Sequence, residues 1–294
     1  MSAKEELREL ANTLSEYECG HLLNLVKGTA EGRRYWEDDI GILYNEYVKG
    51  RLANFNHNPE SIVPATLELE DGIFAPIPLV KSYPDAQRVG LLAPQEISAT
   101  LGNTLLNRRS RRDFTGNAIS LQSLSTLLHY GCGTIGFVPA YDFARFPMRT
   151  FPSSGGLQSP EVYVAVHRVE GLSAGLYHYR FVDHVLEQLK LGEQNTILQN
   201  IALGQPWVAE ASVVLLLTGC YERLRWKYNE RAYRFMCMDT GFLAENLYLA
   251  AEALQLGICA IAGFIDDVLE LLLEIDGQQE TVLLMICAGE VRSI

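Results

Sequence analysis

The sequence predicts an α+β fold in which a mixed, mostly antiparallel sheet of about five strands is sandwiched by helices. Three observations lead to this prediction. Residues 234–256 read as one long central helix, without proline and apolar on nearly every side. Residues 161–169 and 176–181 alternate in hydrophobicity around a glycine-containing turn, which is typical of a β-hairpin. Three further apolar runs have the length of buried strands and lie at residues 212–218, 258–261 and 281–287.

Composition limits the classes of function. The chain has 294 residues, of which 48% are hydrophobic, and a formal net charge of −12, which argues against nucleic acid or an anionic membrane as its main partner. No apolar run approaches the roughly 18 residues of a membrane helix, and the charged first ten residues contain no apolar signal core. A cytoplasmic location is therefore expected. The six cysteines form no CxxC pair and the histidines show no metal-ligand spacing, so neither a disulfide framework nor a metal site is expected.

The first 95 residues differ in character from the rest. Residues 3–14 and 32–49 have helical periodicity, and six of the eleven prolines lie between Pro59 and Pro94. A segment so rich in proline holds neither a long helix nor a central strand. We therefore predict a helical and proline-rich extension over residues 1–95 and a ligand-binding domain over residues 96–294.

The elements of the second part follow from local signals. Residues 97–106 have a helical pattern, and Ser120 is a suitable N-cap for a helix over 121–130 that Gly131 closes. Residues 195–203 form a helix stopped by Gly204 and Pro206, and residues 266–274 form a short helix between two strands.

The long helix leads into a candidate ligand-binding turn. Gly257 is a plausible helix stop, and the strand at 258–261 ends in Ala262, Gly263 and Phe264. Small residues at the end of a buried strand suit the close approach of a flat ligand. On these residues alone, a plain core helix followed by an ordinary strand is the simpler interpretation.

Four arginines and a serine lie together in this acidic chain, as Arg108, Arg109, Ser110, Arg111 and Arg112. The plain interpretation is a solvated charge run at a helix end. The exclusive use of arginine and the central hydroxyl favour an anion site instead, because guanidinium forks and hydroxyls bind phosphate through several hydrogen bonds.

Two further segments are candidates for chemistry. The loop Pro152, Ser153, Ser154, Gly155 is either a plain loop or a cradle whose small residues admit a flat ring. Lys227 stands beside Tyr228 and among three arginines, whose like charges would lower its pKa, as a basic catalyst requires. An exposed basic helix start explains the second segment equally well.

The order of these motifs identifies a family resemblance. The chain contains, in this order, the motifs RRSRRDF, PSSGG, EVYVAV, GLSAGLYHY, WVAEASVVLLLTG, WKYNERAYRF and LGICAIAGF. In this order of motifs it resembles the nitroreductase superfamily, and the resemblance covers residues 96–294. It is most similar to the SagB-type branch, the flavin-dependent azoline dehydrogenases.

The resemblance implies an FMN-binding fold that forms a homodimer, with two flavins and the long helix at the subunit interface. The FMN phosphate and ribityl chain would lie at the arginine cluster. The ring would lie at the loop Pro152, Ser153, Ser154, Gly155, which we call the serine-glycine loop, and near the turn after the strand at 258–261. The implied cofactor-binding residues are Arg108, Arg109, Ser110, Arg112, Pro152, Ser153, Ser154, Gly155, Ala262 and Gly263. The implied catalytic pair is Lys227 and Tyr228, either of which could be the base.

The expected function is the FMN-dependent oxidation of an azoline to an aromatic azole in natural-product biosynthesis, with a substrate that is free or borne on a peptide or carrier. Flavin takes the hydride, a base takes the proton, and dioxygen reoxidises the flavin. The alternatives are an NAD(P)H-dependent nitro- or quinone reductase on the same fold, and a flavin-loaded scaffold subunit of a biosynthetic complex.

Overall fold

The computed structural model describes residues 79–141 and 143–292, all of which belong to the compact unit Pro64–Ile294. The helices predicted at 3–14 and 32–49 lie outside these residues. Within the described part, no helix combines the length and the hydropathy that crossing a bilayer requires.

The centre of the fold is a seven-stranded sheet in the order β1-β6-β5-β4-β7-β9-β8, and every neighbouring pair is antiparallel. The sheet therefore has seven strands where the sequence predicted about five. The two additional strands are β1 and β6, which pair with each other at one edge. The seven strands are β1 (Gln87–Gly90), β4 (Pro160–Val166), β5 (Gly175–Arg180), β6 (Val185–Leu191), β7 (Val213–Cys220), β8 (Gly257–Ile261) and β9 (Glu280–Gly289).

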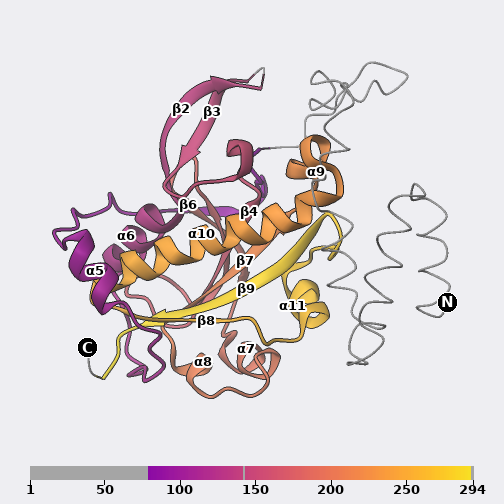
Figure 1. Ribbon diagram of the computed structural model, residues 1–294. Helices are drawn as coiled ribbons and strands as arrows, with labels where there is room; N and C mark the ends of the chain where they lie inside the picture. The colour runs from indigo at the N-terminus through magenta and orange to yellow at the C-terminus, as the bar shows by residue number, and fades with distance from the viewer. Residues whose placement is uncertain (1–78, 142, 293–294) are drawn as a thin grey trace, which may run out of the picture. The chain divides into compact units, whose positions relative to one another are not determined.

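Helices cover both faces of the sheet, as predicted. The helices α6 (Leu121–Cys132) and α10 (Ala232–Ala253) pack on one face, and Figure 1 shows α10 running across it. The other face is covered by α7 (Asn195–Ile201), α8 (Trp207–Glu210) and α11 (Asp266–Leu273). Alternate residues of β4 divide between the two cores, so that Val162 and Val164 face α10 while Tyr163 and Ala165 face the other layer.

The predicted long helix is confirmed as α10, with shifted ends. It begins at Ala232 and ends at Ala253, because Gln255 adopts a left-handed φ of 57° before Gly257 is reached. Gly257 instead begins β8, where an added Cβ would lie 2.0 Å from Val291 Cγ1. One side of α10 is buried, while Met238 and Phe242 are exposed.

Most other predicted elements are present with small boundary shifts. The hairpin is β4–β5, and Ser120 caps α6 by accepting a hydrogen bond from the Ser123 amide at 3.0 Å. The helix predicted at 97–106 is α5 (Leu101–Asn107). Strand β1 lies before residue 95, so the sheet draws on residues upstream of the proposed domain boundary.

A two-stranded hairpin was not predicted at all. Strands β2 (Thr134–Ala140) and β3 (Phe143–Arg149) pair only with each other and project from the body next to α9 (Glu222–Tyr228), as Figure 1 shows. We call this hairpin the β2–β3 arm. Its exposed apolar side chains include Ile135, Phe137 and Phe143.

Candidate functional site

Lys227 and Tyr228 occupy the last two positions of α9. The helix ends there because the next residue, Asn229, has a positive φ of 49°. The Lys227 ammonium donates a hydrogen bond to the Tyr141 hydroxyl at 2.7 Å, and that hydroxyl donates to the Gly155 carbonyl at 2.6 Å. The ring of Tyr228 packs edge-on against Phe235 of α10, with 4.6 Å between ring centroids.

Gly155 lies where these side chains converge. Its φ is 60°, and an added Cβ would lie 2.6 Å from the Tyr228 hydroxyl and 3.1 Å from both the Lys227 ammonium and the Tyr141 hydroxyl. Any side chain at this position would displace that set of polar atoms. The structure therefore brings the predicted catalytic pair to the predicted ring-binding loop, although the two are far apart in sequence.

The expected effect on the pKa of Lys227 is wrong in sign. Burial lowers this pKa, but the hydrogen bond to Tyr141 and the charge interactions with Tyr228 and Tyr141 outweigh burial and raise it. Two of the neighbouring arginines have other contacts: Arg225 is paired to Glu222 at 3.0 Å, and Arg231 lies over the Phe235 ring at 5.7 Å. Lys227 is consequently an ammonium at neutral pH.

Asp239 of α10 holds the serine-glycine loop. Its buried carboxylate accepts hydrogen bonds from the Ser153 hydroxyl at 2.8 Å, the Ser154 amide at 2.9 Å and the Ser154 hydroxyl at 2.8 Å. A longer bond of 3.3 Å comes from the Ser159 hydroxyl. The two serine hydroxyls of the loop thus face the protein interior, which leaves the backbone and Gly155 as its outward surface.

Arg223 holds α9 against the same loop. One helical turn before Lys227, its guanidinium donates to the Gln158 carbonyl at 2.9 Å and to the Glu161 carboxylate at 2.5 Å. Burial alone would raise the pKa of Glu161, but Arg223 and His178 hold it well below its usual range. This buried ion pair fixes the helix that carries Lys227 relative to β4.

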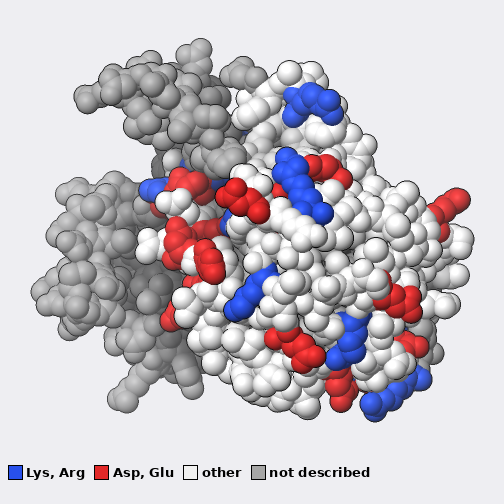
Figure 2. Space-filling model, turned by 180° about the vertical axis from the view of Figure 1, so that it is seen from behind, with Lys and Arg blue, Asp and Glu red and all other residues white. Residues whose placement is uncertain are grey.

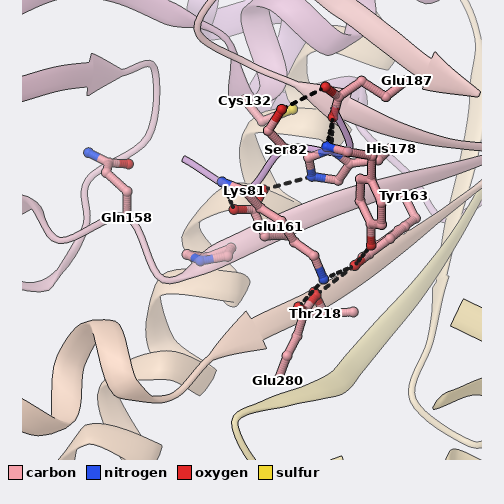
Figure 3. A network of polar contacts seen from close by, with 12 residues as sticks. Lys81, Ser82, Cys132, Gln158, Glu161, Tyr163, His178, Glu187, Thr218 and Glu280 are labelled. Carbon is pink, nitrogen blue, oxygen red and sulfur yellow. Dashed lines mark hydrogen bonds and ion pairs between the residues drawn. The ribbon is translucent and has the colours of Figure 1, made fainter. Parts of the chain in front are cut away.

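The Arg223–Glu161 pair belongs to a larger buried network, which Figure 3 shows from close by. His178 lies between two carboxylates, with Nε2 3.1 Å from Glu161 and Nδ1 3.0 Å from Glu187. Because both ring nitrogens face carboxylates, both must carry hydrogen, and the imidazole is protonated. Burial lowers the pKa of His178, and its hydrogen bonds to the two carboxylates raise it above its ordinary value.

The other end of the network ties the segment before β1 to the sheet. Lys81 contacts the Glu280 carboxylate and donates to the Tyr163 hydroxyl at 2.6 Å. Glu280 also accepts from Tyr163 at 2.9 Å and from Thr218 at 2.6 Å. Since its members are buried and bonded to one another, we assign this network a structural role.

The arginine cluster lies beside β8. The Arg111 amide donates to the Ile258 carbonyl at 2.9 Å, and the Ser110 hydroxyl lies 3.0 Å from the Tyr248 hydroxyl. Tyr248 in turn accepts from the Ala260 amide at 2.7 Å, two residues before Ala262 and Gly263. The cluster and the small-residue turn therefore belong to one region.

The side chains of this cluster differ in their contacts. Arg108 approaches Glu245 at 3.7 Å, a long and half-exposed ion pair. Arg112 lies over the Trp207 ring at 5.6 Å, and Arg109 donates to the backbone carbonyls of its own turn.

The two groups of candidate residues lie on opposite sides of α10. Asp239 contacts the serine-glycine loop, and Tyr248 contacts Ser110. These anchors are nine residues apart, which is about two and a half helical turns and roughly 13 Å along the axis. The two side chains therefore point to opposite sides of the helix. Figure 1 likewise shows α5, which leads into the arginine cluster, and α9 at opposite ends of α10. One chain therefore does not bring the arginines and the Lys227 region face to face.

Comparison with known proteins identifies the family. The model of the nitroreductase family matches residues 105–290. The chain belongs to the nitroreductase family. A Methanocaldococcus jannaschii protein named as a nitroreductase is 31% identical over 191 residues, which cover 65% of this chain and 91% of the relative.

Two other relatives of this nitroreductase family member are named as processing proteins. The trifolitoxin-processing protein of Rhizobium leguminosarum bv. trifolii is 28% identical over 54% of this chain and 44% of its own length. The microcin B17-processing protein of Escherichia coli is 26% identical over 49% of this chain and 54% of its own length. The matches thus span about half the length of both relatives.

Solved structures agree on the fold. A crystal structure of an Anabaena variabilis protein named as a nitroreductase has a TM-score of 0.60 at 28% identity, over 75% of this chain and 45% of that one. The E. coli microcin synthetase complex with bound precursor contains a chain with a TM-score of 0.54 at 20% identity, over 83% and 99%. At that identity, the second likeness establishes the fold alone.

Proposed function

We propose that this nitroreductase-family protein is an FMN-dependent dehydrogenase that oxidises an azoline, or a related heterocyclic intermediate, to the aromatic azole in natural-product biosynthesis. The observation that carries the proposal is the convergence of Lys227 and Tyr228 on Gly155. This convergence supports a candidate base beside a loop whose small residues could receive a flat ring. The names of the trifolitoxin and microcin relatives support the same class of substrate.

The residues present fit FMN. Gly155 and Gly156 have φ values of 60° and 71° and add no side chain of their own to the loop, so only the polar ends of Lys227, Tyr228 and Tyr141 lie over Gly155. The buried Gln158 Oε1 lacks a hydrogen-bond partner next to this loop. The cluster of Arg108, Ser110 and Arg112 supplies the charged donors that a phosphate monoester needs.

We assign the ring contacts to the loop Pro152, Ser153, Ser154, Gly155, chiefly through its backbone, and to the backbone of Ala262 and Gly263. The phosphate contacts go to Arg108, Arg109, Ser110 and Arg112. When bound at these residues, FMN would supply the hydride acceptor, with dioxygen as the final oxidant.

The protein's part in the reaction is to hold the substrate ring and take one proton. Aromatisation of an azoline removes a hydride from one ring carbon and a proton from the next. Lys227 can accept this proton only as the neutral amine, which is the minor form at neutral pH because its pKa is raised. The Tyr228 hydroxyl is the second candidate for the base. We therefore expect the rate to increase with pH if Lys227 is the base.

A homodimer would complete the site. Because the arginine cluster and the Lys227 region lie on opposite sides of α10, a second copy must supply one of the two groups if both serve one flavin. The exposed Met238 and Phe242 of α10, 47% and 42% accessible, provide an apolar surface for that contact. Ala244 and Ala251 face the protomer's own core.

The proposed partners are a second copy and a heterocyclic substrate that is free or borne on a peptide or carrier. We propose no nucleic-acid or membrane partner and a cytoplasmic location, in keeping with the net charge of −12. On the face shown in Figure 2, basic and acidic side chains of the described residues are interspersed, without a broad basic patch.

The second candidate is an NAD(P)H-dependent nitro- or quinone reductase. It is favoured by the nitroreductase name of the M. jannaschii relative, 91% of which aligns with this chain. Fold alone does not separate the two activities.

One set of measurements decides between them. Heat-released cofactor is identified by chromatography, and flavin absorbance is then followed anaerobically with a short synthetic peptide carrying one thiazoline, or with NAD(P)H. Bleaching by the thiazoline supports the dehydrogenase. Bleaching by NAD(P)H alone, followed by rapid turnover with a nitroarene, would support the reductase, and release of FAD would contradict the cofactor assignment.

A further inference from the structure

The β2–β3 arm reaches the candidate site through Tyr141, which follows β2. The phenol accepts a hydrogen bond from Lys227 at 2.7 Å and donates one to the Gly155 carbonyl at 2.6 Å. The Lys227 nitrogen also lies 4.8 Å from the centroid of the Tyr141 ring. Three segments that are distant in sequence, namely the arm, α9 and the serine-glycine loop, are thus joined by one hydroxyl group.

The placement of the Tyr141 ring is itself supported. Its ring packs against Phe146 of β3 at a centroid distance of 5.4 Å, and Phe146 is only 3% accessible. Phe146 belongs to the same buried cluster as Leu157, which follows the serine-glycine loop, and Leu224, which lies on α9. The residue that supports the Tyr141 ring is therefore buried, whereas Ile135, Phe137 and Phe143 of the arm are exposed.

We propose that Tyr141 is a positioning residue of the site: it holds Lys227 against the Gly155 carbonyl and so couples the placement of the arm to the reactivity of that lysine. The proposal rests on the proposed function only in giving Lys227 a catalytic task. The hydrogen-bonded connection itself does not depend on the identity of the substrate.

The coupling follows from counting hydrogens. A phenol carries one hydrogen, and in this arrangement the hydrogen of Tyr141 is directed to Gly155 while its oxygen accepts from the Lys227 ammonium. If Lys227 becomes neutral and its lone pair turns to the phenol, Tyr141 must turn its hydrogen away from Gly155 to keep the bond. The neutral amine keeps two N–H groups and can also go on donating to Tyr141, so the loop carbonyl is released only in the arrangement in which the lysine lone pair faces the phenol.

The charged surroundings of Lys227 agree with this role. Burial lowers the pKa of Lys227, and the hydrogen bond to Tyr141 is the foremost influence that raises it. Tyr228 of α9 raises it further. The other titratable groups on α9 and on the adjoining turn are Glu222, Arg223, Arg225, Glu230 and Arg231.

The test measures the protonation of Lys227 directly, with no substrate. The purified full-length protein is treated with a trace of acetic anhydride at pH 7–11, and acetylation of Lys227 is quantified by mass spectrometry against Lys190 in the same digest. The variants are Tyr141→Phe, which removes only the hydroxyl, and Tyr130→Phe as the matched control. Tyr130 and Tyr141 are both 37% accessible.

We expect the midpoint of Lys227 acetylation to move down by roughly 0.5–1 pH unit in Tyr141→Phe, which is about three- to tenfold more neutral amine at a fixed lower pH. Tyr130→Phe should match the wild type. An unchanged midpoint in Tyr141→Phe, with flavin content and melting temperature like those of the control, would overturn the proposal. The labelling result stands whether or not thiazoline bleaches the flavin, so failure of the proposed function is recognised separately.

Discussion

Replacing Asp239 by asparagine tests whether the serine-glycine loop is held for ligand binding. Asparagine has nearly the same shape but only one acceptor oxygen. If that oxygen keeps the two bonds from Ser154, an amide nitrogen replaces the oxygen that accepts from Ser153 at 2.8 Å and from Ser159 at 3.3 Å. The Ser153 hydroxyl is already an acceptor for the Gln158 amide at 2.9 Å, so it is poorly placed to accept a second hydrogen.

The expected loss is that of one good hydrogen bond to a charged group. Such a bond contributes about 1.5–3 kcal/mol, and the 3.3 Å bond adds little. Burial raises the pKa of Asp239 despite the opposing serine hydrogen bonds, so removing its charge also removes a desolvation cost. The net expectation is the lower half of that range, or about 10- to 40-fold weaker FMN binding.

Flavin titration by fluorescence quenching measures this effect, together with the melting temperature. Thr240→Val is the matched control, because Thr240 is the next residue, is buried, and bonds only the Met236 carbonyl of its own helix at 2.9 Å. We expect the control to keep wild-type affinity. If Asp239→Asn lowers the melting temperature but binds FMN as the control does, the carboxylate stabilises the fold and not the binding loop.

The remaining predictions concern catalysis, cofactor affinity, assembly and pH. Lys227→Ala should keep its flavin but lose about 10²–10⁴ in the rate of anaerobic bleaching by a thiazoline peptide, with unchanged reduction by dithionite. Arg108→Ala should weaken FMN binding about ten- to a hundredfold, and more than Arg111→Ala, in the same titration. Phe242→Arg should give monomers with reduced flavin content in sedimentation; a flavin-replete monomer would refute the shared site. His167 is buried and its pKa is lowered to about 4, chiefly by burial. The unfolded chain therefore binds a proton that the fold does not, so stability should fall by about 3 kcal/mol as pH drops from 6.5 to 4, and less in His167→Gln, measured by urea unfolding.

The part of the fold that the sequence predicts is the part with simple hydrophobic patterns. Strands β4, β5, β7, β8 and β9 are apolar or alternating, and all five were predicted. Strand β6 was not predicted because Glu187 interrupts its pattern. This carboxylate is buried because His178, Ser82 and the Tyr83 amide bind it from other segments. Strand β1 has four residues and is largely exposed, so it carries no hydrophobic signal.

The β2–β3 arm was not predicted from the sequence for a different reason. Both of its strands contain proline, Pro139 in β2 and Pro147 in β3, which counts against a strand in the interior of a sheet. An isolated two-stranded arm has two free edges, and a proline whose nitrogen faces an edge costs no ladder hydrogen bond. Local sequence therefore cannot distinguish such an arm from a loop.

The candidate site divides in the same way. Its motif residues were predicted from composition, from the order of the motifs and from the family resemblance, whereas Tyr141, Arg223 and Asp239 act only through tertiary contacts. Asp239 did leave a signal, as a lone acidic residue within the apolar first half of a long helix. A buried carboxylate in such a place needs donors nearby, and here those donors are the hydroxyls and an amide of the serine-glycine loop.

Lys227 shows most clearly why sequence neighbours mislead about reactivity. Counting charges along the chain placed this lysine among arginines and predicted a lowered pKa. In the fold, Arg225 turns to Glu222, and Arg231 lies over the Phe235 ring at 5.7 Å. The groups that reach the ammonium are phenols, one of them from the arm. A phenol oxygen accepts a hydrogen bond from an ammonium and stabilises its charge, whereas a guanidinium repels it. The kind of side chain that reaches Lys227 therefore decides whether its pKa is raised or lowered. If Lys227 is the base, the protein must therefore release its proton by moving Tyr141, by excluding water when substrate binds, or by working at higher pH.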